Sequence, residues 1–350
     1  MPLSNRATRF QDIPREYRWE SLDDARLQTL TLNALHLHLR DSLVWPEVER
    51  LYADLDRRRL RFRPHCWLSS EWFSPDGVPG IAIPFFVAHP RLRRLERHMM
   101  GEVEGGNSKW RLRILRHEAG HAIDTAYGLR RRADWREVFG YASEPYPQKY
   151  AVRPASRRYV QHLDYWYAQS HPTEDFAETF AVWLQPRARW RRDYAGWPAL
   201  KKLEYVDALM ADIAGRSPRV RSRATVAPLT DLRQTLAEHY RAKKSAYALS
   251  DRRYDEWLTR EFAGRQGRSR CTSAARFIRE IAPKLQLSLV TNESISSYFA
   301  NHVIRRVEAR VHALDLVLRA SRRESLRRVL TLHERVAVDM LRRNRETYLL

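Results

Sequence analysis

Cysteine is nearly absent from this 350-residue chain, which contains only Cys66 and Cys271. Two cysteines this far apart exclude a disulfide framework and a four-cysteine zinc site. Long hydrophobic runs are also missing, since no window approaches the roughly 18 uninterrupted apolar residues of a membrane-spanning helix. Residues 1–13 alternate polar and charged side chains and lack the apolar segment of a secretion signal. We therefore expect a cytoplasmic protein without membrane insertion.

Glycine is scarce, at 12 residues, and neither GxGxxG nor GxxxxGK occurs, so a Rossmann-type or P-loop nucleotide site has no support. Lysine is scarcer still, and arginine supplies most of the formal net charge of +21. Two thirds of the excess lies in residues 201–350, which carry a net +14. This charge could bind a polyanion such as nucleic acid, but a GC-rich genome and solvated helix faces would produce the same bias.

The composition of the chain changes near residue 200, because ten of the eleven tryptophans lie before it. Length and this change together predict more than one domain. The stretch 215–223 combines glycine, proline and serine with four arginines and has the composition of a linker. We predict an N-terminal helical region at 1–60, a mixed α and β domain at 61–215, and a basic, mainly α-helical domain at 216–350.

Secondary structure can be read coarsely from apolar periodicity and turn residues. The expected elements are strands at 62–70 and 81–88 and helices at 108–127, 293–320 and 321–345. Ser108 could cap the first of these helices, and Gly128 is placed to end it. Beyond residue 200 we expect helices only.

The helix expected at 108–127 contains the motif HExxH, formed by His117, Glu118 and His121. Residues four apart share one helix face, so the two histidines can present ring nitrogens to a single metal ion, and Glu118 leans toward its water. Random placement of the 13 histidines and 42 acidic residues would produce only about 0.06 such motifs in this length. The motif therefore predicts a zinc site rather than two unrelated surface histidines.

A catalytic zinc site needs a third protein ligand, and acidic residues further along the chain are candidates. A helix with Thr173 as its N-cap would carry Glu174 in its first turn and Glu178 one turn later. Glu178 could accept a hydrogen bond from a ligand histidine and determine its tautomer. Asp124, three residues after His121, could do the same or be a solvated helix residue. Glu174 alone could also be an acid that complements the helix dipole.

The segments HEAGHAID at 117–124 and SHPTEDFAETFAVWL at 170–184 resemble bacterial zinc-binding metallopeptidases, a gluzincin-like group. More distantly they are similar to the catalytic domain of anthrax lethal factor. The resemblance covers about residues 62–200 and implies an α+β zincin-like fold with a small sheet and Glu174 as third zinc ligand. Tyr167 stands where the lethal-factor pattern has a tyrosine. Its hydroxyl could donate to a developing oxyanion, or the ring could simply pack with neighbouring aromatics.

These features predict a zinc-dependent metallopeptidase that acts on a peptide or protein. Zn²⁺ held by His117, His121 and Glu174 would activate water, and Glu118 would take the proton as general base. The alternative is a zincin-like protein whose basic C-terminal domain carries the main function by binding nucleic acid or a protein partner. The intact Glu118 favours the enzyme, because a scaffold would not need a base.

Overall fold

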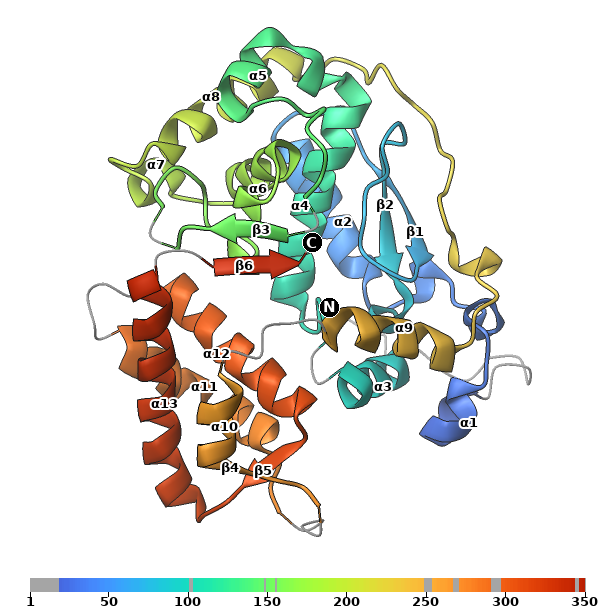
Figure 1. Cartoon of the computed structure of the whole chain (residues 1–350). Coiled ribbons are helices and arrows are strands. Elements are labelled where there is room, and N and C mark those ends of the chain that lie inside the picture. Colours follow the sequence, from blue (N-terminus) through green and yellow to red (C-terminus); the bar gives the residue numbers. More distant parts are fainter. Residues whose placement is uncertain are drawn as a thin grey trace, which may run out of the picture.

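The computed structural model in Figure 1 describes residues 19–100, 103–147, 149–154, 156–248, 254–266, 271–290, 297–343 and 346–349. Its helices are α1 (Asp24–Gln28), α2 (Trp45–Arg57), α3 (Pro90–Met100), α4 (Ser108–Tyr127), α5 (Ala133–Phe139), α6 (Pro172–Leu184), α7 (Trp190–Asp193), α8 (Ala199–Ile213), α9 (Leu236–Ala248), α10 (Asp255–Glu261), α11 (Ala274–Val290), α12 (Ser297–Ala313) and α13 (Arg322–Arg343). Its strands are β1 (His65–Ser69), β2 (Gly80–Pro84), β3 (Lys149–Val152), β4 (Phe262–Gly264), β5 (Leu316–Leu318) and β6 (Glu346–Leu349). This helix-rich structure with small sheets agrees with the expected mixture of α and β elements.

The strands form three two-stranded sheets among the described residues. β1 and β2 run parallel, with His65 opposite Gly80 and Ser69 opposite Pro84. The strand expected at 81–88 is wrong beyond Pro84, where Phe85–Val87 forms a 3₁₀ helix. A proline has no N–H to donate to a sheet, so it favours the end of strand pairing at this point.

The first hydrophobic core contains buried residues from Trp19 to Tyr240, with α4 near its centre. Two buried ion pairs join α4 to α2. Arg111 Nη2 donates to Glu47 Oε1 at 2.7 Å, and Arg116 Nη2 donates to Asp54 Oδ2 at 2.7 Å. Such pairs hold the helices in register, because removing one partner would leave an uncompensated buried charge. The expected N-terminal helical region therefore shares its core with the helix that carries HExxH.

A second core is formed mainly by α10–α13, drawn in orange and red in Figure 1. Its described members from the C-terminal part begin at Tyr254, whereas Tyr240 on α9 still belongs to the first core. The domain boundaries at 60/61 and 215/216 remain predictions. We call the part of the chain that forms the first core the first unit, and the part around α10–α13 that forms the second core the second or C-terminal unit. The stretch 215–223 contacts the first unit, because the Gly215 N–H donates to the Arg59 carbonyl at 3.0 Å.

The expectation of helices only beyond residue 200 is wrong, because three short strands occur there. β4 and β5 pair antiparallel, which ends α12 at Ala313 and not near 320. The buried apolar residues Leu316–Leu318 cannot extend α12, because Asp315 turns the chain with a φ of 46°. β6 pairs antiparallel with β3, whose Tyr150 and Val152 belong to the second core (Figure 1).

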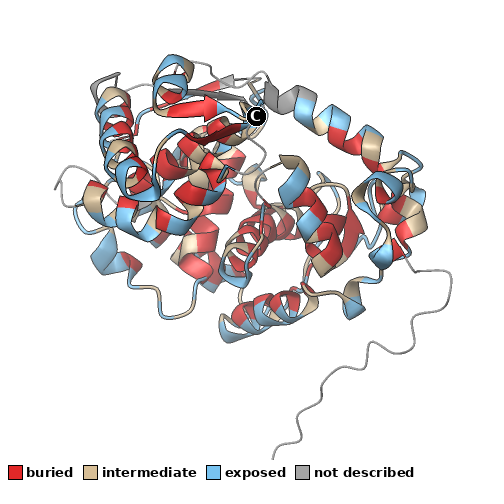
Figure 2. Cartoon of the chain, turned by 90° about the horizontal axis from the view of Figure 1, so that it is seen from below, coloured by how far each residue is buried: buried red, intermediate tan, exposed pale blue. Residues whose placement is uncertain are grey.

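Buried residues follow the inward faces of the helices in both units (Figure 2). Within the described part of the chain, no helix combines the length and the apolar character needed to cross a bilayer. Helices α4 and α6 pack closely on each other. Both are buried over most of their length, which is unusual for helices that carry several ionisable side chains. This pair positions the residues of the candidate site.

Gly120 lies where α4 and α6 meet. A Cβ added to Gly120 would stand 2.7 Å from Cα of Ala177 and 3.1 Å from its carbonyl oxygen. Both atoms belong to the backbone of α6 and cannot rotate away. Glycine is therefore required by the close approach of the two helices, not by the conformation of its own backbone.

We expect Gly120→Ala to push α6 away from α4. Overpacking of this kind costs about 1–3 kcal/mol, so the midpoint of thermal unfolding should fall. Zinc affinity should fall as well, because α6 carries Glu174. Thr125→Ala on the same helix is the control, since Thr125 is only half-buried. Calorimetry and zinc titration of both variants would contradict this account if Gly120→Ala behaved like Thr125→Ala.

Candidate metal centre

Helix α4 presents His117, Glu118 and His121 from its buried middle. The helix begins one residue after Asn107, whose side-chain oxygen accepts the Trp110 N–H at 2.9 Å. The N-cap is thus Asn107, not Ser108, because its side chain can satisfy an N–H that the first turn leaves free. Gly128 ends the helix, as expected, in the left-handed conformation.

Helix α6 presents Glu174 and Glu178 to the same point. It begins at Pro172, so the expected N-cap Thr173 is wrong and His171 takes that position. Proline suits the first helical position because the N–H that it lacks would have no partner there. The Thr173 N–H is accepted by His171 Nδ1 at 3.2 Å. Glu174 is still in the first turn.

Three side-chain atoms from the two helices lie close together. Nε2 of His117 is 3.0 Å from Oε2 of Glu174, and Nε2 of His121 is 3.1 Å from the same oxygen. The two imidazole nitrogens are 3.2 Å apart. A tetrahedral zinc ion with bonds of 2.0–2.1 Å holds its donors about 3.3 Å apart. The spacing of these donors therefore fits a zinc ion bound by two histidines and one carboxylate.

The balance of buried charge also fits a cation. Glu118, Glu174 and Glu178 are at most 7% exposed. The cationic groups that favour their ionised forms are histidines, namely His117, His121 and, for Glu178, His162. Burial by itself raises the pKa of Glu174, but His121 and His117 outweigh it and hold that pKa well below its ordinary value. The carboxylate is therefore ionised and available as a ligand.

Glu178 fixes the orientation of His117. The Nδ1–H of His117 donates to Oε1 of Glu178 at 2.8 Å, and the other carboxylate oxygen accepts the Leu163 N–H at 2.8 Å. A histidine held in this way keeps its Nε2 lone pair free for a metal. Asp124 has another partner, since its two oxygens accept the backbone N–H and the Nε–H of Arg130 at 2.7 and 2.6 Å.

Glu118 lies on the same helix as the two histidines. Its carboxylate accepts no hydrogen bond from the residues that the structure describes. Burial raises the pKa of Glu118, although His117 and His121 lower it in part. A buried carboxylate without a fixed partner can accept a proton from a substrate or a water.

Tyr167 belongs to the 3₁₀ helix η6 (Asp164–Gln169), which precedes α6. Its ring centroid is 5.6 Å from that of His117. Burial and the charges of Glu174 and Glu118 hold the pKa of Tyr167 well above its ordinary value. The hydroxyl therefore stays protonated and remains a hydrogen-bond donor. Tyr167 also packs against the second core, of which Trp166 is a buried member.

Trp166 is one of the residues that connect η6, which carries Tyr167, to α12 of the second unit. Its indole centroid is 4.4 Å from the ring of His302 and 5.6 Å from that of Phe299, both on α12. Its backbone is left-handed, with a φ of 52°, which is rare for a bulky side chain. Asp164 of η6 also forms an ion pair with Arg305 of α12. The tertiary contacts to α12 therefore hold the conformation of η6.

Tyr146 is a site residue that the sequence did not reveal. Its hydroxyl donates to Oε1 of Glu174 at 2.8 Å, and its ring stacks on His171 with centroids 3.9 Å apart. It lies in an irregular loop 28 residues before Glu174, so neither helical periodicity nor a motif connects the two. This hydrogen bond is made to Oε1 of Glu174, whereas His117 and His121 lie next to Oε2.

Comparison with known proteins agrees with this geometry. Residues 86–192 match the model of a family described as "Putative zinc-binding metallo-peptidase". The matched stretch contains all of α4 and α6, and so all three donors. The resemblance to zinc-binding metallopeptidases is thereby confirmed for these residues. No curated protein and no solved structure matches the chain.

Tyr146→Phe should weaken zinc binding without unfolding the protein. Loss of a hydrogen bond to a ligand typically costs about 10- to 100-fold in metal affinity, because the ligand is less firmly oriented. Competition with a chromophoric chelator would measure the zinc affinity. The control is Tyr141→Phe, since Tyr141 is 61% exposed. Equal zinc affinity in the two variants would remove Tyr146 from the site.

Proposed function

We propose that this chain is a zinc-dependent metallopeptidase with a zincin-like catalytic unit. The observation that carries the proposal is the convergence of His117, His121 and Glu174, whose donor atoms are 3.0–3.2 Å apart. Beside them, the carboxylate of Glu118 accepts no hydrogen bond from the described residues. Two histidines and a glutamate are a donor set of catalytic zinc sites that leave one position open. The family match over residues 86–192 supports the same function.

When bound, zinc would supply Lewis-acid polarisation of the scissile carbonyl and lower the pKa of the attacking water. Glu118 would accept a proton from that water as it attacks the carbonyl carbon. The same carboxyl group would then deliver a proton to the departing amine, so that the peptide bond is replaced by a carboxylate and an amine. Glu178 would hold His117 in one tautomer throughout.

Tyr167 would stabilise the negative charge that develops on the carbonyl oxygen. It is protonated, buried and next to His117, so its hydroxyl can donate from a fixed position. The second unit would hold it there, because Trp166 packs on α12 and Asp164 pairs with Arg305. In this proposal the C-terminal helices contribute to catalysis by fixing the loop that carries Tyr167.

Glu118→Gln tests the general base. The amide cannot accept a proton, so hydrolysis should fall by about two to four orders of magnitude while zinc content stays near one per chain. Elemental analysis together with cleavage of a peptide library would measure both. Glu174→Ala should lose the metal, whereas Asp175→Asn, which changes a carboxylate paired with Lys202, should keep it. Wild-type protein that binds no zinc would overturn the proposal.

Tyr167→Phe tests the oxyanion donor. Removal of one such donor typically lowers kcat by about 10²- to 10³-fold. Zinc content and the unfolding temperature should stay as in the wild type, because the hydroxyl of Tyr167 makes no hydrogen bond to the residues that the structure describes. Full activity in this variant would assign Tyr167 to packing alone.

A further inference from the structure

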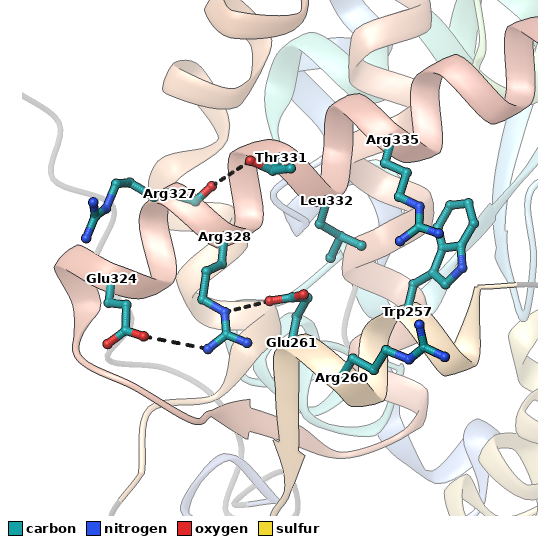
Figure 3. Close-up of a pocket in the computed structure, with 9 residues that line it drawn as sticks. All are labelled: Trp257, Arg260, Glu261, Glu324, Arg327, Arg328, Thr331, Leu332 and Arg335. Carbon is teal, nitrogen blue, oxygen red and sulfur yellow. Dashed lines mark hydrogen bonds and ion pairs between the residues drawn. The ribbon is translucent and has the colours of Figure 1, made fainter.

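A cavity lies in the C-terminal unit, between α10 and α13 (Figure 3). Its volume is about 410 Å³, and none of its lining residues belongs to the metal centre. This volume is in the range of pockets that bind small molecules. Arginines and glutamates form most of the wall, and Trp257 and Leu332 add apolar surface.

The arginines of this cavity are not neutralised equally. Arg328 donates to Glu261 at 2.7 Å and lies 3.7 Å from Glu324, so its charge is balanced within the wall. Arg260 has a carboxylate only at 4.0 Å, from Glu256, which does not line the cavity. Among the described residues, Arg327 and Arg335 have no carboxylate partner. The cavity therefore carries excess positive charge.

Some arginines of the same unit have close carboxylates. Arg310 binds Asp255 through two hydrogen bonds of 2.6 Å, and Arg279 binds Glu308 at 2.7 Å. Three guanidinium groups left without a close carboxylate around one cavity are available to an external anion.

Trp257 organises the cavity. The guanidinium carbon of Arg335 is 3.8 Å from the centroid of the indole, a stacked arrangement that restricts the arginine. In Figure 3, Arg260 also extends beside Trp257, and Leu332 lies between Arg335 and Glu261. Two guanidinium groups thus lie next to an apolar wall made by the indole and the leucine.

We propose that this cavity binds a small phosphate monoester. Arg335 and Arg260 would hold the phosphate oxygens, because the planar guanidinium donates paired hydrogen bonds to oxyanions. A phosphate monoester carries about −1.5 to −2 charges at neutral pH, which matches two guanidinium groups without a close carboxylate better than the single charge of a carboxylate ligand does. Trp257 and Leu332 would contact the organic part of the ligand. This site does not depend on the proposed peptidase activity.

Calorimetric titration of the full chain with phenyl phosphate at low ionic strength tests the site. We expect saturable binding that is at least tenfold tighter than binding of inorganic phosphate or benzoate. Arg335→Gln and Arg260→Gln should each weaken it at least tenfold. Arg276→Gln is the control, because Arg276 has an exposed side chain on α11 and pairs with Glu280 outside the cavity.

Four results would overturn the proposal. These are the absence of saturable binding, equal affinity for benzoate, equal affinity for inorganic phosphate, and unchanged affinity in both pocket variants. The unfolding temperature of each variant shows whether it is folded. If Arg335→Gln does not fold, Arg260→Gln still tests the proposal, because the side chain of Arg260 is exposed. Zinc content should be the same in all three variants, so the result is independent of the metal centre.

Discussion

Helices α4 and α6 approach each other so closely at Gly120 that no side chain fits between them, and the candidate site depends on this contact. A glutamate side chain reaches only a few ångströms from its helix. Glu174 on α6 can therefore stand 3.0–3.1 Å from two histidines on α4 only if the backbones almost touch. The same approach brings Glu178 within 2.8 Å of His117. Much of the remaining first unit, including the ion pairs between α2 and α4, holds α4 where this contact occurs.

The site concentrates negative charge where water is largely excluded. Buried carboxylates are costly unless cations or hydrogen bonds compensate them. Glu178 has two hydrogen-bond donors, and Glu174 has the two histidines and Tyr146. Glu118 has no such donor among the described residues. This contrast separates two roles. The carboxylates of Glu174 and Glu178 are held in place, whereas the carboxylate of Glu118 is the one to which the proposed mechanism assigns proton transfer.

The two cores are not independent, because η6 contributes to both. Trp166 is buried in the second core and Tyr167 packs against that core, yet the Tyr167 ring also lies 5.6 Å from the ring of His117 on α4, whose apolar residues belong to the first core. The segment before η6 is tied to the site as well, since the Leu163 N–H binds the carboxylate that orients His117. The strand β3, which pairs with β6, likewise places Tyr150 and Val152 in the second core. A change in the packing of α12 would therefore reach Tyr167 through a single peptide bond.

The helices and caps that depend on neighbouring residues were predictable from the sequence. HExxH at helical spacing predicted that His117, Glu118 and His121 share a helix, and that helix ends at Gly128 as expected. The first-turn position of Glu174 was also predictable, although the cap was displaced from Thr173 to His171. These features depend on periodicity and on capping, which act over a few residues.

Contacts between segments that are distant in the sequence became visible only in the tertiary structure. Tyr146 donates to Glu174, Arg130 donates to Asp124, and Trp166 packs in the second core. No local sequence pattern indicates any of these contacts. The division between the cores also differs from the change in composition. Composition records what each residue is, whereas a core is defined by which apolar faces cover one another. The candidate metal site combines both kinds of information, since α4 supplies two of its donors, His117 and His121, and the packing of α6 on α4 supplies the third, Glu174.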